Sequence, residues 1–349
     1  MGNILEIIMK KQIIIGFAAL LLFVSCNNDK KILDSLAEYN SSMETKGYHF
    51  GDKLDLPENI LDNAESIVIS FGDKETSSLV VDSRYFTLGD NAVTFNIKKK
   101  DGQVLTQDAT INVFAKNPEV KMTYTLVSEY PHNPTSFTEG FYMEGNTVYE
   151  SVGLDGASKF MKYDLGSETV IKEAKQPDTV FSEGISSIGN KIYQLTYKAK
   201  KGFIYDKNSF ELIGEFAYPN VIGEGWGMTT DGKYLMVSDG TKNIYFLNPN
   251  DPSKMERFIS VAGNSEVYDQ INELEYHKGF IYSNVWHKNI ILKINPANGE
   301  VVGKFDLSQI ANKYTEENPE NVLNGIAFKG DNMVITGKNW PKIYEVSLK

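Results

Sequence analysis

Residues 184–195 read GISSIGNKIYQL, in which a glycine is followed five residues later by a second glycine and then by a hydrophobic strand. The pattern occurs five times, and a leucine replaces the first glycine once. The first positions are Gly140, Gly184, Gly227, Leu274 and Gly325, and the strands are expected at residues 146–151, 190–195, 233–238, 280–285 and 331–336. Successive first positions lie 44, 43, 47 and 51 residues apart, which suits four short strands and is too short for a self-sufficient domain. The repeat therefore predicts an all-β fold built from propeller blades.

Each repeat continues with a third strand that ends in an Asx or proline turn and, where the chain is long enough, with a fourth hydrophobic run such as residues 301–307. The fifth repeat ends after its third strand, residues 342–348, so we expect residues 122–129 to supply its outer strand. Joining both ends would remove an exposed sheet edge. We predict a closed five-bladed β-propeller over residues 119–349. An open stack or a two-sheet sandwich is the alternative.

Length and charge narrow the function classes. With 349 residues the chain has room for two domains and a large core. Lys and Arg total 35 against 46 Asp and Glu, a net charge of −11, and no basic stripe is present, so a nucleic-acid partner is not expected. The aromatic content of 12% is typical of a β-rich protein.

The first residues resemble a targeting segment. Lys10 and Lys11 precede an apolar stretch at residues 13–24, which is too short to span a bilayer as a mature helix and ends just before Cys26. Cys26 is the only cysteine of the chain. We predict a lipoprotein signal peptide at residues 1–25, lipidation of Cys26, and a protein tethered to a membrane of the bacterial cell envelope, periplasmic or surface-exposed. An ordinary secretory signal or an anchor helix with an incidental cysteine is the alternative.

Residues 26–118 form a separate region with alternating runs broken by Gly-Asp and Asp-Gly turns. The runs lie at residues 66–71, 78–82, 92–97 and 109–114. Such strands over about 90 residues suit a small immunoglobulin-like β-sandwich. We expect it to be a spacer that lifts the propeller off the membrane, with partner binding as the alternative.

Residues beside each repeat's first position should meet, because inner strands of a propeller line one channel and ligands bind at its mouth. They are Glu139, Glu183, Trp226, Asn272 with Glu273, and Asn324, and the ends of the second strands add Tyr197, Trp286 and Lys338. Carboxylates, amides and indoles together indicate a pocket for a small polar ligand. Solvated glutamates and aromatic packing between blades are the structural alternatives.

The histidines and the glycine-rich segments restrict the types of reaction that the site could catalyse. The four histidines, His49, His132, His277 and His287, show neither a metal-binding spacing nor a relation to a nucleophilic serine. No glycine-rich phosphate loop lies between a strand and a helix. We therefore expect no metal and no cofactor, which leaves proton transfer by carboxylates.

Six short segments together resemble the motif series of the plant and bacterial glutaminyl cyclases, the glutamine cyclotransferase family. They read YPHNPTSFTEG (130–140), FSEG (181–184), GEGWG (223–227), NELEY (272–276), NVW (284–286) and TGKNWP (336–341). The resemblance covers about residues 122–349 and omits residues 26–118. It implies a five-bladed propeller that converts the N-terminal glutamine of peptides to pyroglutamate with release of ammonia, an intramolecular aminoacyl transfer that uses no organic cofactor. Peptides or proteins with N-terminal glutamine would be its partners, and we expect a monomer.

The resemblance also implies roles. Glu183 would carry the proton from the substrate ammonium to the departing ammonia, while Lys338 and Asn272 would stabilise the oxygen of the tetrahedral intermediate. A glutamate beside aromatic rings can have a raised pKa, which suits that shuttle. The substrate-binding set would be Phe137, Glu139, Phe181, Tyr197, Trp226, Trp286 and Asn324.

Two positions depart from the family pattern. Glu139 stands where the family commonly has glutamine, and Tyr197 stands where it commonly has tryptophan. Tyr197 keeps an aromatic wall. A carboxylate at 139 cannot donate the amide's hydrogen bond and could compete with Glu183 for a proton, which would shift the pH optimum, alter substrate preference, or leave a site that binds without turnover.

Two other functions remain open at this point. A non-catalytic cell-surface propeller could bind peptides or glycans in the same pocket. A propeller hydrolase or lactonase would need metal-binding groups at the channel centre, a set that Glu139, Glu183, Asn272 and Asn324 could mimic. Ammonia release from a glutaminyl dipeptide would distinguish the cyclase from the non-catalytic propeller. Loss of activity on chelation would favour the hydrolase or lactonase.

Overall fold

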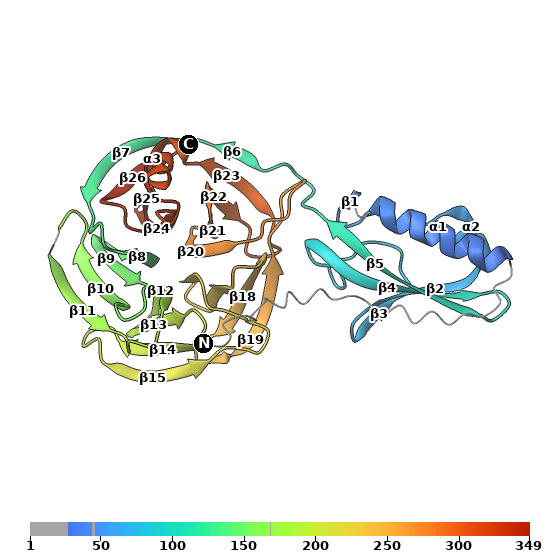
Figure 1. The fold of residues 1–349 in the computed structure, drawn as a ribbon, viewed down its shortest axis with the longest axis horizontal. Coiled ribbons are helices and arrows are strands. Elements are labelled where there is room, and N and C mark those ends of the chain that lie inside the picture. The colour runs from blue at the N-terminus through green and yellow to red at the C-terminus, as the bar shows by residue number, and fades with distance from the viewer. Residues whose placement is uncertain (1–26, 44–45, 168) are drawn as a thin grey trace, which may run out of the picture.

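The computed structural model describes residues 27–43, 46–167 and 169–349. Figure 1 shows two parts, a small sheet covered by helices and a ring of sheets that contains the C-terminus. Most of the regular structure is β-strand, so the prediction of an all-β class is confirmed. No helix in the described part of the chain is long and apolar enough to cross a membrane. The predicted signal peptide and Cys26 lie outside the described residues.

The N-terminal part is one five-stranded sheet in the order β1-β5-β4-β2-β3, in which β1 runs parallel to β5 and the other pairs are antiparallel. Its elements are α1 (Asn27–Met43), β1 (Gly47–Tyr48), α2 (Glu58–Asn63), β2 (Ala64–Phe71), β3 (Lys74–Thr76), β4 (Gly89–Lys99) and β5 (Val104–Val113). The expected immunoglobulin-like sandwich needs a second sheet, and the described residues form only this one here.

Helix α1 takes the place of the second sheet. Strand β4 alternates buried and exposed positions, so one face of the sheet needs a cover. Ile32, Leu36 and Tyr39 are spaced for one face of a helix and pack into the same core as Phe95 and Ile111. Three of the four expected runs are strands, whereas residues 78–82 form only an isolated bridge at Val80, and the layer that covers the sheet was assigned wrongly.

Five further sheets follow along the chain and form the ring (Figure 1). The first contains β8 (Thr138–Glu144), β9 (Thr147–Val152), β10 (Lys159–Asp164) and β11 (Val170–Lys175). The second contains β12 (Ser182–Ile188), β13 (Lys191–Thr196), β14 (Lys201–Asp206) and β15 (Leu212–Ala217). The third contains β16 (Met228–Thr230), β17 (Leu235–Ser238), β18 (Asn243–Asn248) and β19 (Asp251–Ser260). Each is an antiparallel meander, as the period of the repeat predicts.

The last two sheets also use strands from before the repeats. The fourth contains β20 (Ile271–His277), β21 (Phe280–Val285), β22 (Lys288–Ile294) and β23 (Val301–Asp306), with β6 (Val120–Met122) paired in parallel to β23. The fifth follows helix α3 (Ser308–Glu317) and contains β24 (Leu323–Lys329), β25 (Asn332–Gly337) and β26 (Lys342–Leu348), with β7 (Tyr124–Pro131) antiparallel to β26. The expected outer strand from before the repeats is therefore present, and the pairing of β6 is an addition that we did not expect.

The two glycine positions of the repeat require glycine for different physical reasons. A Cβ on Gly184 would lie 2.4 Å from the Met228 nitrogen, and one on Gly227 would lie 2.1 Å from the Asn272 oxygen, so the inner strands of neighbouring sheets approach too closely for a side chain. The second glycine turns the chain into the next strand, with a positive φ of 62° at Gly145 and 58° at Gly189.

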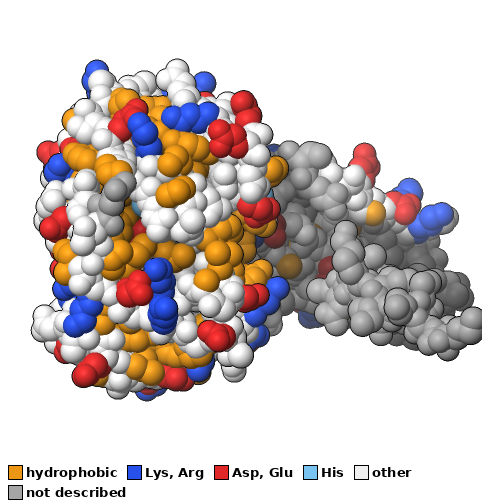
Figure 2. All heavy atoms as spheres, turned by 60° about the vertical axis from the view of Figure 1, so that its left-hand side comes forward, with side chains coloured by type: hydrophobic (Ala, Val, Ile, Leu, Met, Phe, Trp, Pro, Cys, Tyr) orange, Lys and Arg blue, Asp and Glu red, His pale blue; other side chains and the backbone are white. Residues whose placement is uncertain are grey.

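The outer surface of the ring carries hydrophobic side chains between charged ones, as Figure 2 shows. Exposed examples on the outermost strands are Val127 on β7, Ile171 on β11 and Leu212 on β15. Apolar groups are common on protein surfaces, so their presence does not by itself mark an interface.

Candidate active site

A cavity of about 270 Å³ lies where the ends of the inner strands meet the loops of the ring. It brings together nearly all the site residues that the sequence predicted. Its lining comprises Phe137, Glu139, Phe181, Glu183, Tyr197, Trp226, Asn272, Trp286, Glu320 and Lys338. Asn324 lies directly behind it, where its amide nitrogen donates to a carboxylate oxygen of Glu139 at 3.2 Å.

Strand pairing explains why distant residues meet. The first residue of an inner strand pairs with the last residue of the second strand, as Ser182 pairs with Thr196 and Leu323 with Gly337. The residues that follow the second strand, such as Tyr197 and Lys338, therefore lie beside those that begin the inner strand, such as Glu183. The hairpins of the second and fourth sheets each deliver two side chains to the cavity in this way, Glu183 with Tyr197 and Asn272 with Trp286.

Glu139 and Lys338 form a buried ion pair in the cavity wall. Lys338 Nζ donates to Glu139 Oε1 at 2.6 Å, and their side chains are 9% and 3% exposed. The second carboxylate oxygen accepts from Asn324, so both oxygens of Glu139 are engaged. The ammonium also lies 4.5 Å from the centre of the Phe137 ring. The lysine that the resemblance assigns to the oxyanion therefore already has an anionic partner.

Glu183, unlike Glu139, has no ion-pair partner in the part of the chain that the structure describes. Burial, the largest influence, and the nearby Glu139 carboxylate raise the pKa of Glu183 well above its usual range, although Lys338 opposes them. Burial also raises the pKa of Glu139, and Lys338 opposes this as well. Among the described residues no hydrogen bond acts on the Glu183 carboxyl, only burial and nearby charges, and the side chain lines the cavity. It is therefore free to exchange a proton with a bound ligand.

Aromatic rings form the rest of the wall. Trp226 and Trp286 meet edge to face with centroids 5.6 Å apart, and Phe181 lies 6.0 Å from Tyr197 and 6.3 Å from Phe137. The Trp226 indole nitrogen donates to Glu224 at 3.1 Å, which fixes its orientation. These rings exclude water from the carboxyl groups and strengthen every charge interaction inside the cavity.

Sequence and structure comparisons agree with this geometry. A family model described as glutamine cyclotransferase matches residues 101–348. The chain belongs to the glutamine cyclotransferase family. A relative from Arabidopsis thaliana, a glutaminyl-peptide cyclotransferase, is 35% identical over 229 residues, which are 64% of this chain and 71% of that protein. The crystal structure of a Myxococcus xanthus glutaminyl cyclase matches with a TM-score of 0.61 and 31% identity, and the match covers 66% of this chain and 98% of that one.

This member of the glutamine cyclotransferase family has one cavity residue that sequence reasoning missed. Glu320 lies in the loop between α3 and β24, exposed at the cavity rim. Its neighbour Asn321 accepts from the Trp340 indole nitrogen at 2.9 Å and so holds the loop against the turn after β25. The spacing of 51 residues before Gly325, the longest of the repeat, was the available signal that an insertion occurs there.

One residue expected near the cavity, Glu273, lies elsewhere. Glu273 is fully buried behind it, where its carboxylate accepts from the Phe141 nitrogen at 3.3 Å and the Ile326 nitrogen at 2.9 Å. It therefore ties the inner strands of the first, fourth and fifth sheets of the ring together. Trp340 is also buried and packs against Tyr314 of α3, at a centroid distance of 4.4 Å.

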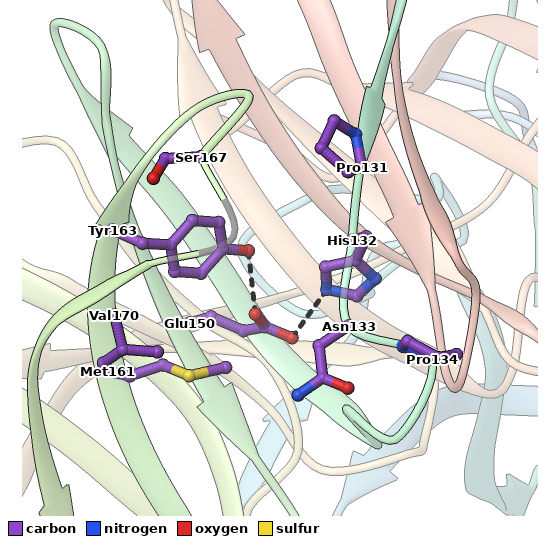
Figure 3. A pocket seen from close by; sticks show the side chains of 9 residues that line it. All are labelled: Pro131, His132, Asn133, Pro134, Glu150, Met161, Tyr163, Ser167 and Val170. Carbon is purple, nitrogen blue, oxygen red and sulfur yellow. Dashed lines mark hydrogen bonds and ion pairs between the residues drawn. The ribbon is translucent and has the colours of Figure 1, made fainter.

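A second cavity, of about 240 Å³, lies between β7 and the first sheet of the ring (Figure 3). His132 Nε2 lies 3.1 Å from Glu150 Oε1, which also accepts from the Thr138 hydroxyl at 2.7 Å. The other oxygen, Oε2, accepts from the Tyr163 hydroxyl at 2.8 Å. The other His132 ring nitrogen bonds to the Trp340 carbonyl at 2.6 Å. Because these charged groups already satisfy one another, the cluster fixes the closure of the ring and offers no free group to a ligand.

No group of three or more His, Cys, Asp or Glu side chains suited to a metal ion occurs among residues 27–43, 46–167 and 169–349.

Proposed function

We propose that the protein is a glutaminyl-peptide cyclotransferase that converts the N-terminal glutamine of peptides to pyroglutamate and releases ammonia. One observation carries the proposal: the buried Glu183 carboxyl has a raised pKa and no partner among the described residues, and it faces a small cavity walled by aromatic rings. A group poised to gain and lose a proton is what this reaction needs. The cavity is of a size to enclose one amino-acid side chain.

The reaction needs no protein nucleophile. The α-amine of the substrate attacks its own side-chain carboxamide, a new C–N bond closes the five-membered ring, and the original C–N bond breaks as ammonia leaves. Holding the amine and the carbonyl carbon in contact supplies much of the acceleration, because effective molarities reach on the order of 10⁵ M or more for well-oriented groups. The aromatic walls formed by Phe137, Trp226 and Trp286 serve this positioning.

Glu183 carries the proton in the proposed mechanism. It accepts a proton from the substrate ammonium, which makes the amine nucleophilic, and gives the proton to the departing nitrogen. The second proton that the ring nitrogen must lose passes to the released ammonia, which leaves as ammonium. A raised pKa makes the protonated form a useful acid for the second step near neutral pH. Lys338 and Asn272 face the same cavity and would stabilise the carbonyl oxygen as its negative charge develops.

The other expectations extend this proposal. The five sheets of the ring would be the blades of a five-bladed propeller over residues 119–349, and the reaction would be an intramolecular aminoacyl transfer. Lipidation of Cys26 after cleavage of residues 1–25 would tether a monomeric enzyme to a membrane of the bacterial cell envelope. The apolar stretch at residues 13–24 and the single cysteine support the tether.

The first test is ammonia release from a glutaminyl dipeptide such as Gln-Ala, with the Glu183→Gln variant as control. Activity in the wild type and its loss in the variant would support the proposal. A second candidate, a pocket that binds peptides without turnover, is favoured by one observation, the engagement of Lys338 by Glu139. Binding of the dipeptide without ammonia release from about pH 5 to about pH 9, with folding confirmed, would select it.

A further inference from the structure

The N-terminal sheet contacts the loop of the ring that follows β17. Lys242 Nζ forms an ion pair with the Asp90 carboxylate and donates to the Asp90 backbone oxygen at 3.1 Å. A Cβ on Gly89 would lie 3.1 Å from Lys242 Cδ, so the stem of the lysine lies flat on the start of β4. The Lys242 side chain is only 15% exposed.

A second set of contacts fixes the same junction beside the loop before β20. The Ala115 nitrogen donates to the Gly263 oxygen at 2.9 Å, and the Asn264 side chain donates to the Ala115 oxygen at 3.1 Å. Ala262 is buried in the same hydrophobic cluster as Val113 of the N-terminal sheet. The N-terminal part is therefore docked on the ring and is not joined to it by a linker alone.

The loop held by Lys242 also packs behind the cavity wall, against Trp226. A Cβ on Gly240 would lie 2.5 Å from the Trp226 ring, so the backbone of the loop packs directly against the indole. The Gly240 oxygen accepts from the Gln270 nitrogen at 3.0 Å, and the Gln270 oxygen accepts from the Trp286 nitrogen at 2.9 Å. One loop thus supports both tryptophans.

Hydrogen bonds to the Asp239 side chain tie the loop together. Asp239 accepts from the Thr241 nitrogen at 3.1 Å and the Thr241 hydroxyl at 2.6 Å, and its other oxygen accepts from Tyr245 at 3.1 Å. These bonds leave few soft torsions between Lys242 and Gly240. A change in how Asp90 holds Lys242 should therefore move the backbone under Trp226.

We propose that Asp90 is a positioning residue for substrate binding, because its ion pair with Lys242 holds the loop that supports Trp226 and Trp286. The N-terminal part then has a role in the pocket and is more than a spacer. This inference rests on the proposed function only in that the tryptophans contact the glutaminyl substrate. Strand β4, which carries Asp90, ends before the start of the family match at residue 101.

The test uses the full chain with Asp90→Ala and, as a matched control, Asp331→Ala. Asp331 also forms an ion pair, with the more exposed Lys278, between turns that do not line the cavity. We expect Asp90→Ala to raise KM for Gln-Ala about threefold to fivefold, the range that a partly exposed ion pair supports, with kcat nearly unchanged. The control should leave both constants unchanged.

Two further readouts separate positioning from simple loss of stability. The chain has three tryptophans, so a shift of their emission in Asp90→Ala at an unchanged unfolding midpoint reports on the wall. The exchanged pair, Asp90→Lys with Lys242→Asp, should restore both KM and the emission. An Asp90→Ala variant with the KM and emission of the control would overturn the proposal.

A third readout does not depend on turnover. Quenching of tryptophan emission by Gln-Ala measures binding directly, and weaker quenching in Asp90→Ala than in Asp331→Ala supports the positioning role even in a protein that releases no ammonia. Equal quenching by both variants refutes that role, whereas absence of ammonia release from the folded wild type refutes the proposed reaction.

Discussion

Lys338 donates a 2.6 Å hydrogen bond to Glu139 inside the cavity wall, so the cation proposed to stabilise the oxyanion is already shared with a carboxylate. In the family pattern that the sequence resembles, a glutamine, with a neutral side chain, commonly occupies the position of Glu139. The pair determines how much positive charge remains for the reaction and how strongly Glu183 holds its proton. It therefore sets the first prediction.

Glu139→Gln should raise turnover and move the acid limb of the pH profile to lower pH. The Glu139 carboxylate raises the pKa of Glu183, and Lys338 lowers it. Replacing Glu139 by glutamine removes the first influence and frees Lys338 to exert the second, so both changes lower the pKa of Glu183. Turnover of Gln-Ala should rise by about tenfold if about 1.4 kcal/mol of oxyanion stabilisation is restored. Glu173→Gln, on the surface strand β11, is the control. An unchanged profile would mean that Glu139 is not detuning the site.

Glu183→Gln should abolish turnover while the dipeptide still binds. The amide keeps the shape of the side chain but cannot carry a proton, so kcat should fall by about 10² to 10⁴ with little change in KM. Steady-state ammonia release gives both constants. A variant with near-wild-type kcat would remove Glu183 from the mechanism.

Trp226→Ala should weaken binding more than turnover. The indole packs on Gly240 and meets Trp286 edge to face, so its removal opens the wall without touching the proton shuttle. We expect KM to rise by roughly tenfold, which corresponds to about 1.4 kcal/mol of lost contact. An equal loss of kcat in this variant and in Glu183→Gln would contradict the assigned division of labour.

Lys338→Met should destabilise the protein as well as inactivate it. The change leaves Glu139 buried without its counter-charge, and breaking such a pair costs about 3 to 5 kcal/mol. Adding Glu139→Gln should recover most of the unfolding free energy but not the activity. Urea unfolding of the two single variants and the double variant checks this, and a double variant no more stable than Lys338→Met would disprove the coupling.

The buried His132–Glu150 pair should make stability depend on pH. Burial is the largest influence on His132 and lowers its pKa, but Glu150 outweighs it and the pKa is raised above the ordinary 6.5. Burial likewise acts to raise the pKa of Glu150, but His132 and its other donors lower it below the ordinary 4.5. The His132 contribution is full below 6.5 and is lost as pH rises through its folded pKa. The Glu150 contribution is present above 4.5 and is lost as pH falls through its folded pKa.

The pair should therefore stabilise the ring most between about pH 4.5 and about pH 6.5. His132→Leu should lower the unfolding free energy by about 3 kcal/mol there and flatten its pH dependence. His277→Leu, on the half-buried end of β20, controls for the loss of a histidine. Parallel pH dependences in His132→Leu and the wild type would show that the imidazole is neutral throughout.

The repeat was readable from sequence because its glycines have local causes. Gly145 needs a positive φ, and Gly184 leaves no room for a Cβ, so both requirements are written into residue type. The convergence of Glu139, Glu183 and Lys338 followed from the same period. The ion pair between Glu139 and Lys338 did not, because a hydrogen bond across 199 residues depends on side-chain packing and not on spacing.

Other features of the structure could not be predicted from the sequence, for related reasons. Alternation in β4 shows that one face is buried but not whether a sheet or a helix covers it, and α1 proved to be the cover. Glu320 lies in an insertion with no counterpart in the other repeats, so no periodic argument could place it at the rim. Strand β6 has only three residues, too few for a recognisable pattern.

The pairing of β7 with β26 has a consequence for biosynthesis. These strands join residues 124–131 to residues 342–348, so the ring stays open until the last strand has left the ribosome. Until then β7 exposes an unpaired edge that carries Leu126 and Val127 and can recruit strands from other nascent chains. Loss of β26 would leave β7 without its partner and yield a molecule prone to self-association.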